Sequence, residues 1–486
     1  MSVRVVDHAL WVRDIRTRMP FRYGIAAMTR VPHTVLALEL EVDGERARGL
    51  AAESLVPKWF TKDPDSPYAD DIQDMLDQIH GAVASARGAG GQASAFALWR
   101  RVYEARTEES DEAGTPGLLS NLGTSLVERA LLDGVCRSRG QSLADALRGD
   151  GFGFEADYFH PSLHGATPDR ILPRQPLRTL QARHTVGLGD PLTSADIPQE
   201  ERLNDGLPQS LEAVVRVYGV RWFKIKIGGQ AEEDLERLQQ IATLLGGSRP
   251  DARYTLDGNE QYLDFGTFRT FWETLARDPA LQAFRSGLEF IEQPLHRDIA
   301  LDRETTEVLR TWEDHPPVII DESDGDIGGL AQALANGYQG TSHKNCKGVF
   351  KSVANLGRLQ QLRDENPDRA YVLSGEDLTN VGPIALLQDL AVLASLGISH
   401  AERNGHHYFT GLSMQADSIQ ETMLDHHSDL YRRHALSGGD TPAVAIDDGR
   451  VQLGSVVAAP FGYGPSLDLD GFSPLADWDV SAYREV

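Results

Sequence analysis

Cysteine is almost absent from this chain of 486 residues, in which only Cys136 and Cys346 occur. Two thiols cannot build a disulfide framework, which indicates a reducing compartment. Basic charge is also scarce: 47 lysines and arginines stand against 72 aspartates and glutamates, so the net charge is -25. This excess of negative charge argues against a nucleic-acid partner, because nucleic-acid binding depends on contacts to phosphates.

Long hydrophobic runs are missing as well. No stretch approaches the roughly 18 apolar residues that cross a bilayer. The first residues carry charges every few positions, unlike a signal peptide. We therefore expect a soluble, cytoplasmic protein without a membrane partner, and the length predicts one large domain beside a smaller one.

Residues 1–150 have the pattern of an α+β module. Residues 33–55 contain extended segments around Asp43–Gly44, a strong hairpin signal. Apolar residues then recur at three- and four-residue spacing in 70–87 and 125–140, as they do in amphipathic helices.

Residues 175–435 have a different, repeating pattern. Eight short apolar runs recur, and helical stretches separate most of them; the runs are TLQARHTVGL, RWFKIKIGG, RYTLDGNEQY, LEFIEQPL, PPVIIDESDG, GYQGTSHKNC, AYVLSGEDL and GISHAERNG. Strands that alternate with helices indicate a parallel sheet, and eight such units match the size of a (β/α)8-type barrel. An open, doubly wound sheet is the structural alternative.

The position of charge within these runs favours the barrel. Apolar residues come first and charged residues last: Lys226, Asp257, Glu292, Asp321, Lys344, Glu376 and Glu402. In a closed parallel barrel all strand carboxyl ends open on one face, so these side chains would converge on a single cavity. An open sheet would spread them along one edge.

Three of the acids have the character of a metal site. Asp257, Glu292 and Asp321 offer oxygen-only ligands on consecutive strands, which is typical of a hard cation such as Mg²⁺. Each acid could instead cap the helix that follows its strand. Asp321 and Glu322 are adjacent, so strand alternation should send them to opposite faces, and Asp321 is assigned to the cavity.

Two lysines are candidates for the reaction itself. Lys224 and Lys226 lie two residues apart, so both face the same side of a strand. We expect burial and mutual repulsion to lower the pKa of one amine and make it a usable general base. Lys347 and Lys351 are expected to be solvated surface charges.

The polar motifs, taken in their order along the chain, resemble those of the enolase superfamily. The resemblance rests on Lys-x-Lys at 224–226, Asp-x-Asn at 257–259, Glu-Gln-Pro at 292–294, Asp-Glu-Ser at 321–323 and Lys344. The pattern is more similar to the muconate-lactonizing type than to the mandelate-racemase type. The resemblance covers nearly the whole chain.

The resemblance implies an α/β fold, namely a modified TIM barrel, (β/α)7β, with an α+β capping domain formed by the N-terminal part and the C-terminal tail. The expected boundaries are 1–150 for the cap, 151–178 for an approach segment, 179–435 for the barrel and 436–486 for the segment that returns to the cap. A homo-oligomer is also expected.

The resemblance further implies a chemistry. The three acids would hold Mg²⁺, and the carboxylate of a small-molecule substrate would bind to that ion. The shared step removes the proton α to the carboxylate, and the resulting enediolate is stabilised by the cation and by Lys224. Lys226 and Lys344 match the acid/base lysines on the two faces of the substrate.

Six further residues are candidates for substrate contacts: Asn259, Glu402, Tyr23, Lys58, Trp59 and His406. The cap residues among them could equally be surface or hinge residues, and Glu402 could equally cap a helix or form a salt bridge. Three functions stay open: a racemase, epimerase or cycloisomerase; an acid-sugar dehydratase; and a non-catalytic carboxylate-binding barrel.

Overall fold

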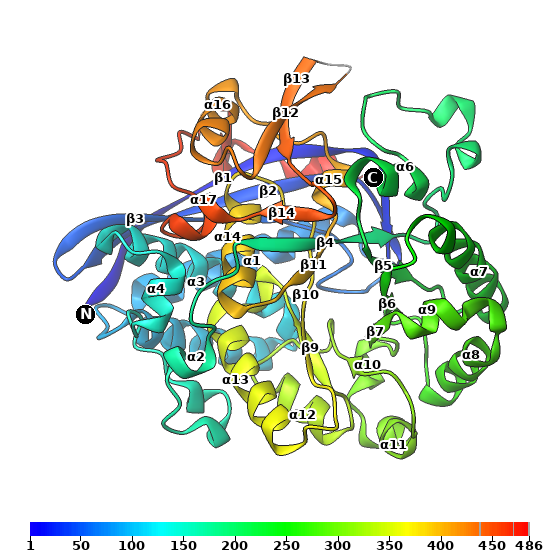
Figure 1. The fold of residues 1–486 in the computed structure, drawn as a ribbon. Coiled ribbons are helices and arrows are strands. Elements are labelled where there is room, and N and C mark those ends of the chain that lie inside the picture. Colours follow the sequence, from blue (N-terminus) through cyan, green and yellow to red (C-terminus); the bar gives the residue numbers. More distant parts are fainter. Residues whose placement is uncertain (437–438, 470, 485–486) are drawn as a thin grey trace.

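The computed structural model describes residues 1–436, 439–469 and 471–484 and divides them between a cap and a barrel (Figure 1). The cap contains an antiparallel sheet in the order β15-β1-β2-β3. Its elements are β1 (Val3–Tyr23), β2 (Ala26–Val42), β3 (Glu45–Ser54), β15 (Ser473–Pro474), α1 (Tyr68–Gly88), α2 (Ala95–Ala113), α3 (Gly117–Arg139) and α4 (Leu143–Arg148). Asp43 and Gly44 make the predicted turn between β2 and β3, with φ of 51° and 90°.

The barrel is a closed parallel sheet. Its strands are β4 (Thr179–Val186), β5 (Trp222–Lys226), β6 (Arg253–Asp257), β7 (Leu288–Glu292), β8 (Val318–Ile319), β9 (Gly340–His343), β10 (Val372–Gly375) and β11 (His400–Arg403). They pair in sequence order from β4 to β8 and from β9 to β11, and β11 returns to β4. A parallel bridge from Ile320 to Thr341 joins β8 to β9. Closure confirms the predicted barrel and excludes the open sheet.

Helices surround this sheet in the expected alternation. They are α5 (Pro168–Ile171), α6 (Leu211–Tyr218), α7 (Ala231–Ser248), α8 (Phe265–Arg277), α9 (Gln282–Ser286), α10 (Arg297–Ala300), α11 (Arg303–Thr311), α12 (Gly329–Ala335), α13 (Val349–Glu365) and α14 (Ile384–Leu396). After β11 come α15 (Gly405–Tyr408), α16 (Asp417–His426), β12 (Tyr431–Leu436), β13 (Gly439–Val444), β14 (Arg450–Gln452) and α17 (Gly454–Ala458). Within the described residues, none of the helices combines the length and the apolar character needed to span a bilayer.

Short-range signals define where these elements begin and end. Ser94 Oγ accepts a hydrogen bond from Ala97 N at the start of α2, and Gly114 ends that helix in the left-handed conformation. In β5 the buried Phe223 and Ile225 alternate with Lys224 and Lys226. Because successive strand residues face opposite sides, the apolar pair packs outward under the helices and the lysines face the barrel interior.

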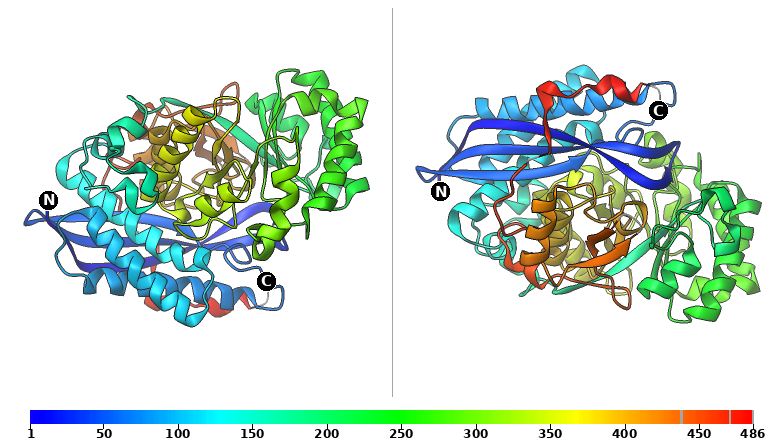
Figure 2. Two further views of the ribbon diagram at one scale, coloured as in Figure 1. Left: turned by 90° about the horizontal axis from the view of Figure 1, so that it is seen from below. Right: turned by 90° about the horizontal axis from the view of Figure 1, so that it is seen from above.

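The cap is joined to the barrel by buried polar and aromatic contacts. Glu128 on α3 accepts hydrogen bonds from Val349 N at 3.1 Å and from Phe350 N at 2.7 Å, at the first turn of α13. The Phe350 ring packs 5.2 Å from Phe96 of α2, measured between ring centroids. The C-terminal segment lies along the outer side of the cap, where β15 pairs with β1 (Figure 2). The cap therefore sits on the barrel through several separate elements.

We predict that Gly49→Ala destabilises the cap. A Cβ at Gly49 would lie 1.9 Å from Ala130 O and 2.5 Å from Gly134 N, so β3 and α3 would have to separate. The expected loss in the free energy of unfolding is about 1–3 kcal/mol, measurable by urea denaturation. Gly88→Ala is the matched control, since nothing lies within 4 Å of a Cβ there; equal stability of the two variants would contradict the close approach.

Candidate active site

Three polar residues form a row at the carboxyl ends of β5, β6 and β7. The parallel register places Lys226 beside Asp257 and Asp257 beside Glu292. All three side chains are buried. Strand pairing thus turns residues from three separate motifs into one continuous polar edge at the mouth of the barrel.

Lys224 lies among four carboxylates. Its Nζ is 3.0 Å from Asp257, 2.8 Å from Glu292, 2.7 Å from Glu376 and 3.1 Å from Glu402. Burial alone would lower the pKa of this amine, but the negative charges around it raise the pKa well above its usual value. Lys224 is therefore the counter-ion shared by acids from β6, β7, β10 and β11.

Lys226 faces a cavity between the two domains. Its Nζ donates a hydrogen bond of 2.6 Å to Asp257 Oδ2. The cavity has a volume of about 320 Å³, and residues 22–27 of the cap line it together with Leu188 and Asn259 of the barrel. Lys226 is thus accessible to a small molecule held between cap and barrel.

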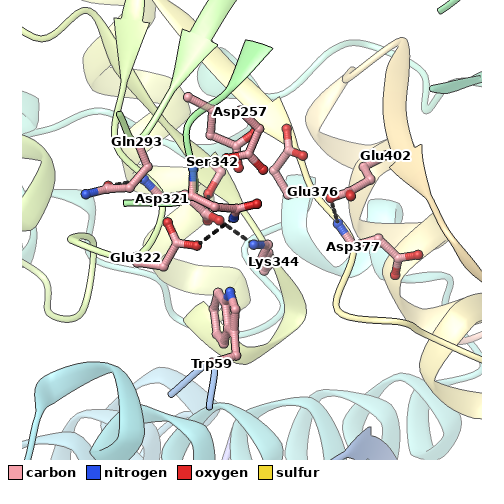
Figure 3. Close-up of polar contacts among 12 residues, drawn as sticks. Trp59, Asp257, Gln293, Asp321, Glu322, Ser342, Lys344, Glu376, Asp377 and Glu402 are labelled. Carbon is pink, nitrogen blue, oxygen red and sulfur yellow. Dashed lines mark hydrogen bonds and ion pairs between the residues drawn. The ribbon is translucent and has the colours of Figure 1, made fainter. Parts of the chain in front are cut away.

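Asp321 is held by lysines that follow the neighbouring strand β9, and Figure 3 shows Lys344 beside its carboxylate. Lys344 and Ser342 bond its carboxylate, and Lys347 Nζ lies 2.8 Å from Oδ1. The expectation that Lys347 and Lys351 are solvated surface charges is wrong, because both are buried and Lys351 pairs with an acid, Asp324, at 2.9 Å.

The acids around Lys224 and Lys344 raise the pKa of both amines. Burial alone would lower the pKa of Lys344, but the neighbouring Asp321 raises it above its usual value. Burial would likewise lower the pKa of Lys224, but its four acids outweigh burial and raise it. The two neighbouring lysines are visible in the sequence, but the number of acids around each amine depends on the fold.

Asn259 and Glu322 extend the polar edge. Asn259 N donates to Asp257 Oδ1 at 2.8 Å, and its Nδ2 lies 3.4 Å from Glu322 Oε1. Glu322 is buried like its neighbour Asp321, and burial followed by the charge of Asp321 raises the pKa of Glu322 to about 7. The two adjacent acids therefore have different partners.

The three candidate residues of the cap have different surroundings. The Trp59 ring lies 4.4 Å from Lys344 Nζ. Tyr23 lines the cavity of Lys226, and its hydroxyl donates to Pro57 O at 2.8 Å. Lys58 pairs with Asp71 at 3.0 Å inside the cap, so its charge is already used there.

The two candidates after the last barrel strand also differ. Glu402 contacts Lys224 and accepts a hydrogen bond of 2.6 Å from Thr185 Oγ1. His406 lines a separate cavity beside Tyr218, whose ring lies edge-on at 5.2 Å. Burial lowers the pKa of His406 well below its usual value, so this imidazole is neutral.

Comparison with known proteins agrees with this arrangement. Residues 207–344 match the family described as Enolase C-terminal domain-like. The segment of this chain that contains β5 to β9 is therefore similar to enolase-type C-terminal domains. No curated protein matches the chain.

Several solved structures share the fold across nearly the full length of this chain. A mandelate racemase/muconate lactonizing protein from Herpetosiphon aurantiacus is 15% identical, covers 94% of this chain and 98% of its own, and has a TM-score of 0.57. The muconate lactonizing enzyme of Pseudomonas fluorescens, complexed with muconolactone, is 16% identical with 99% of each chain covered and a TM-score of 0.56. The dipeptide epimerase of Enterococcus faecalis, complexed with Mg and a dipeptide, is 14% identical, with 95% and 99% covered and a TM-score of 0.57.

Sequence reasoning missed one member of this site. Arg183 on β4 forms an ion pair with Glu376 and donates to Gly375 O at 2.8 Å, and both charged side chains are fully buried. A basic residue inside an otherwise apolar run was the available signal. Arg183 and Lys224 together balance the charge of Glu376.

The acids at the mouth of the barrel are the predicted magnesium ligands. Among the described residues, no three His, Cys, Asp or Glu side chains are grouped as metal ligands; lysine amines contact the acids instead. The donor chemistry nevertheless fits, because Asp257, Glu292 and Asp321 are buried carboxylates at neighbouring strand ends. Within the described part of the chain, Glu292 Oε2 accepts no hydrogen bond and has an ion-pair contact of 2.8 Å with Lys224 Nζ, so this oxygen retains capacity to bind a cation.

We predict a pH-dependent loss of stability in Lys224→Met. Without the shared cation the four carboxylates repel, so their folded-state pKa values rise above the unfolded values. The folded state then binds more protons, and stability falls as pH rises from about 5 to 8. Removing one partner of a buried ion pair costs about 3–5 kcal/mol, and urea denaturation at both pH values measures it. Lys351→Met, which frees a single acid, is the control; an equal loss at both pH values in Lys224→Met would contradict the shared role.

Proposed function

We propose that the protein is a Mg²⁺-dependent enzyme of the racemase, epimerase or cycloisomerase type, which removes the proton α to a substrate carboxylate. The observation that carries this proposal is the placement of two buried amines. Lys226 ends β5 and Lys344 directly follows β9, and these strands are four positions apart in a closed barrel of eight. The two lysines therefore reach the mouth from opposite walls, as acid and base on the two faces of one carbon require.

The proton balance uses one lysine on each face. The neutral amine of one lysine takes the α-proton, and the C–H electron pair passes into the carboxylate. The ammonium of the other lysine then returns a proton to the opposite face, which inverts the carbon. A weak carbon acid reacts in this way only where fixed positive charge meets the developing negative charge, and the buried Lys224 supports that role.

A divalent cation fits the same place. Asp257, Glu292 and Asp321 would hold Mg²⁺ through oxygen ligands. When bound, the ion would polarise the substrate carboxylate and withdraw part of its charge. The Enterococcus neighbour, which was crystallised with Mg and a dipeptide, supports both the ion and a small-molecule substrate.

We predict α-proton exchange in D₂O with a carboxylic acid from a panel of acid sugars, N-acyl amino acids and dipeptides in the presence of Mg²⁺. Lys226→Ala and Lys344→Ala should each abolish turnover, because each removes the proton carrier of one face. Proton NMR measures the exchange, and Lys351→Ala controls for the loss of a buried amine outside the mouth.

A wild-type enzyme that exchanges no acid in the panel would overturn the proposal. A keto-acid product would instead assign the dehydratase reaction, in which the β-hydroxyl leaves after the α-proton.

We predict that Asp257→Asn weakens Mg²⁺ binding at least about tenfold, because an amide oxygen carries no formal charge. Lys226→Ala should leave the ion bound, since its amine is no ligand. Isothermal titration calorimetry with Mg²⁺ alone measures both variants. Unchanged affinity in Asp257→Asn would remove this residue from the ligand set.

A further inference from the structure

A barrel arginine holds the backbone of the cap segment that covers the site. Arg297 is the first residue of α10 and lies three residues after Pro294 of the Glu-Gln-Pro segment. Its Nη1 donates to Phe60 O at 3.1 Å, and its Nη2 donates to Trp59 O at 3.0 Å. Because the contacts are to main-chain carbonyls, they fix the position of the segment itself.

Glu260 orients this arginine. Glu260 Oε2 accepts from Arg297 Nε at 2.9 Å and from Arg297 N at 2.8 Å, and Oε1 accepts from Nη2 at 2.7 Å. Lys62 of the cap adds a second cation, 3.4 Å from Glu260, and donates to Asn259 O at 2.9 Å. A planar guanidinium bound on two edges has one orientation, so Arg297, Glu260 and Lys62 form a rigid latch between barrel and cap.

The turn after β6 contains residues of both the latch and the polar row at the barrel mouth. Asn259 and Glu260 both have left-handed backbones, with φ of 40° and 65°. Non-glycine residues keep this conformation only where their surroundings impose it. Asn259 N bonds Asp257 while Glu260 holds the latch, so a single turn serves the site and the cap contact together.

The cap segment bound by Arg297 places Trp59 beside Lys344. The Trp59 ring lies 4.4 Å from Lys344 Nζ and is nearly buried. In Figure 3 the indole rises from the cap towards this amine, on the side away from Asp257. An ammonium over an indole face is attracted to it, so the ring restricts where Lys344 can lie.

We propose that Arg297 is a positioning residue: through the carbonyls of residues 59 and 60 it holds Trp59 against Lys344 and so keeps this lysine in place for proton transfer. The catalytic half of this inference rests on the proposed function of Lys344. The structural half, that Arg297 orders residues 57–62, stands independently of any activity.

Hydrogen exchange tests the structural half on the intact protein. In Arg297→Ala, amides of residues 57–62 should exchange faster, as measured by mass spectrometry of peptides covering that segment. Arg303→Ala, six residues further along on exposed surface, is the matched control and should leave these amides unchanged. Arg297→Lys keeps the positive charge but lacks the planar guanidinium that binds on two edges, so its amides in 57–62 should exchange at an intermediate rate. Unaltered exchange in Arg297→Ala would overturn the latch.

A double-mutant cycle tests the catalytic half, with α-proton exchange as the readout. Arg297→Ala and Trp59→Leu should each lower kcat about tenfold to a hundredfold with less effect on KM, as expected for a misplaced proton carrier. The double variant should be no slower than either single variant, and Trp59→Phe should restore part of the rate. If the loss of kcat in the double variant equals the product of the two single losses, the residues act independently, and the positioning of Lys344 through Trp59 is overturned.

The two halves can fail separately. If the wild-type protein exchanges no carboxylic acid, the proposed function fails while the hydrogen-exchange result still decides the latch. If exchange occurs but Arg297→Ala retains wild-type kcat, the positioning role fails and the proposed function stands.

Discussion

The charge balance around Lys224 is the constraint on which the rest of the site depends. Four carboxylates from four strands lie within 3.1 Å of one ammonium, all of them buried. Unpaired charges in such a place would be far too costly to bury. Arg183 and Lys226 extend the balance to Glu376 and Asp257. The barrel can therefore concentrate acids at its mouth only because it concentrates amines there as well.

The cap and the barrel both contribute residues to the candidate active site. Lys344 has a barrel acid, Asp321, on one side and a cap residue, Trp59, on the other. The cavity of Lys226 likewise has walls from both domains. Contacts such as Glu128 with the first turn of α13 keep the two domains in one arrangement. The candidate active site is thus a property of the interface and not of the barrel alone.

Local patterns predicted much of this arrangement. The eight apolar runs are the eight barrel strands, since strand period and turn residues are short-range properties. Lys347, Lys351 and Lys58 show where such reasoning stops. Lys347 and Lys351 look like ordinary solvated lysines in sequence, and Lys58 is a candidate for a substrate contact, yet each of the three is buried against an acid. Their partners come from other elements: Asp321 and Asp324 follow β8, and Asp71 lies in the first turn of α1.

By itself, the sequence determined the order of strands, the residues at their carboxyl ends and the likeness to the enolase superfamily, because these depend on spacing along the chain. Only the tertiary structure decided how charges are shared. In the folded chain Lys224 contacts four acids, and Asp321 raises the pKa of Lys344. Arg183 forms an ion pair with Glu376, and Arg297 binds the main-chain carbonyl of Trp59. The physical reason is that electrostatic energy depends on distances through space, and barrel closure and cap docking set those distances.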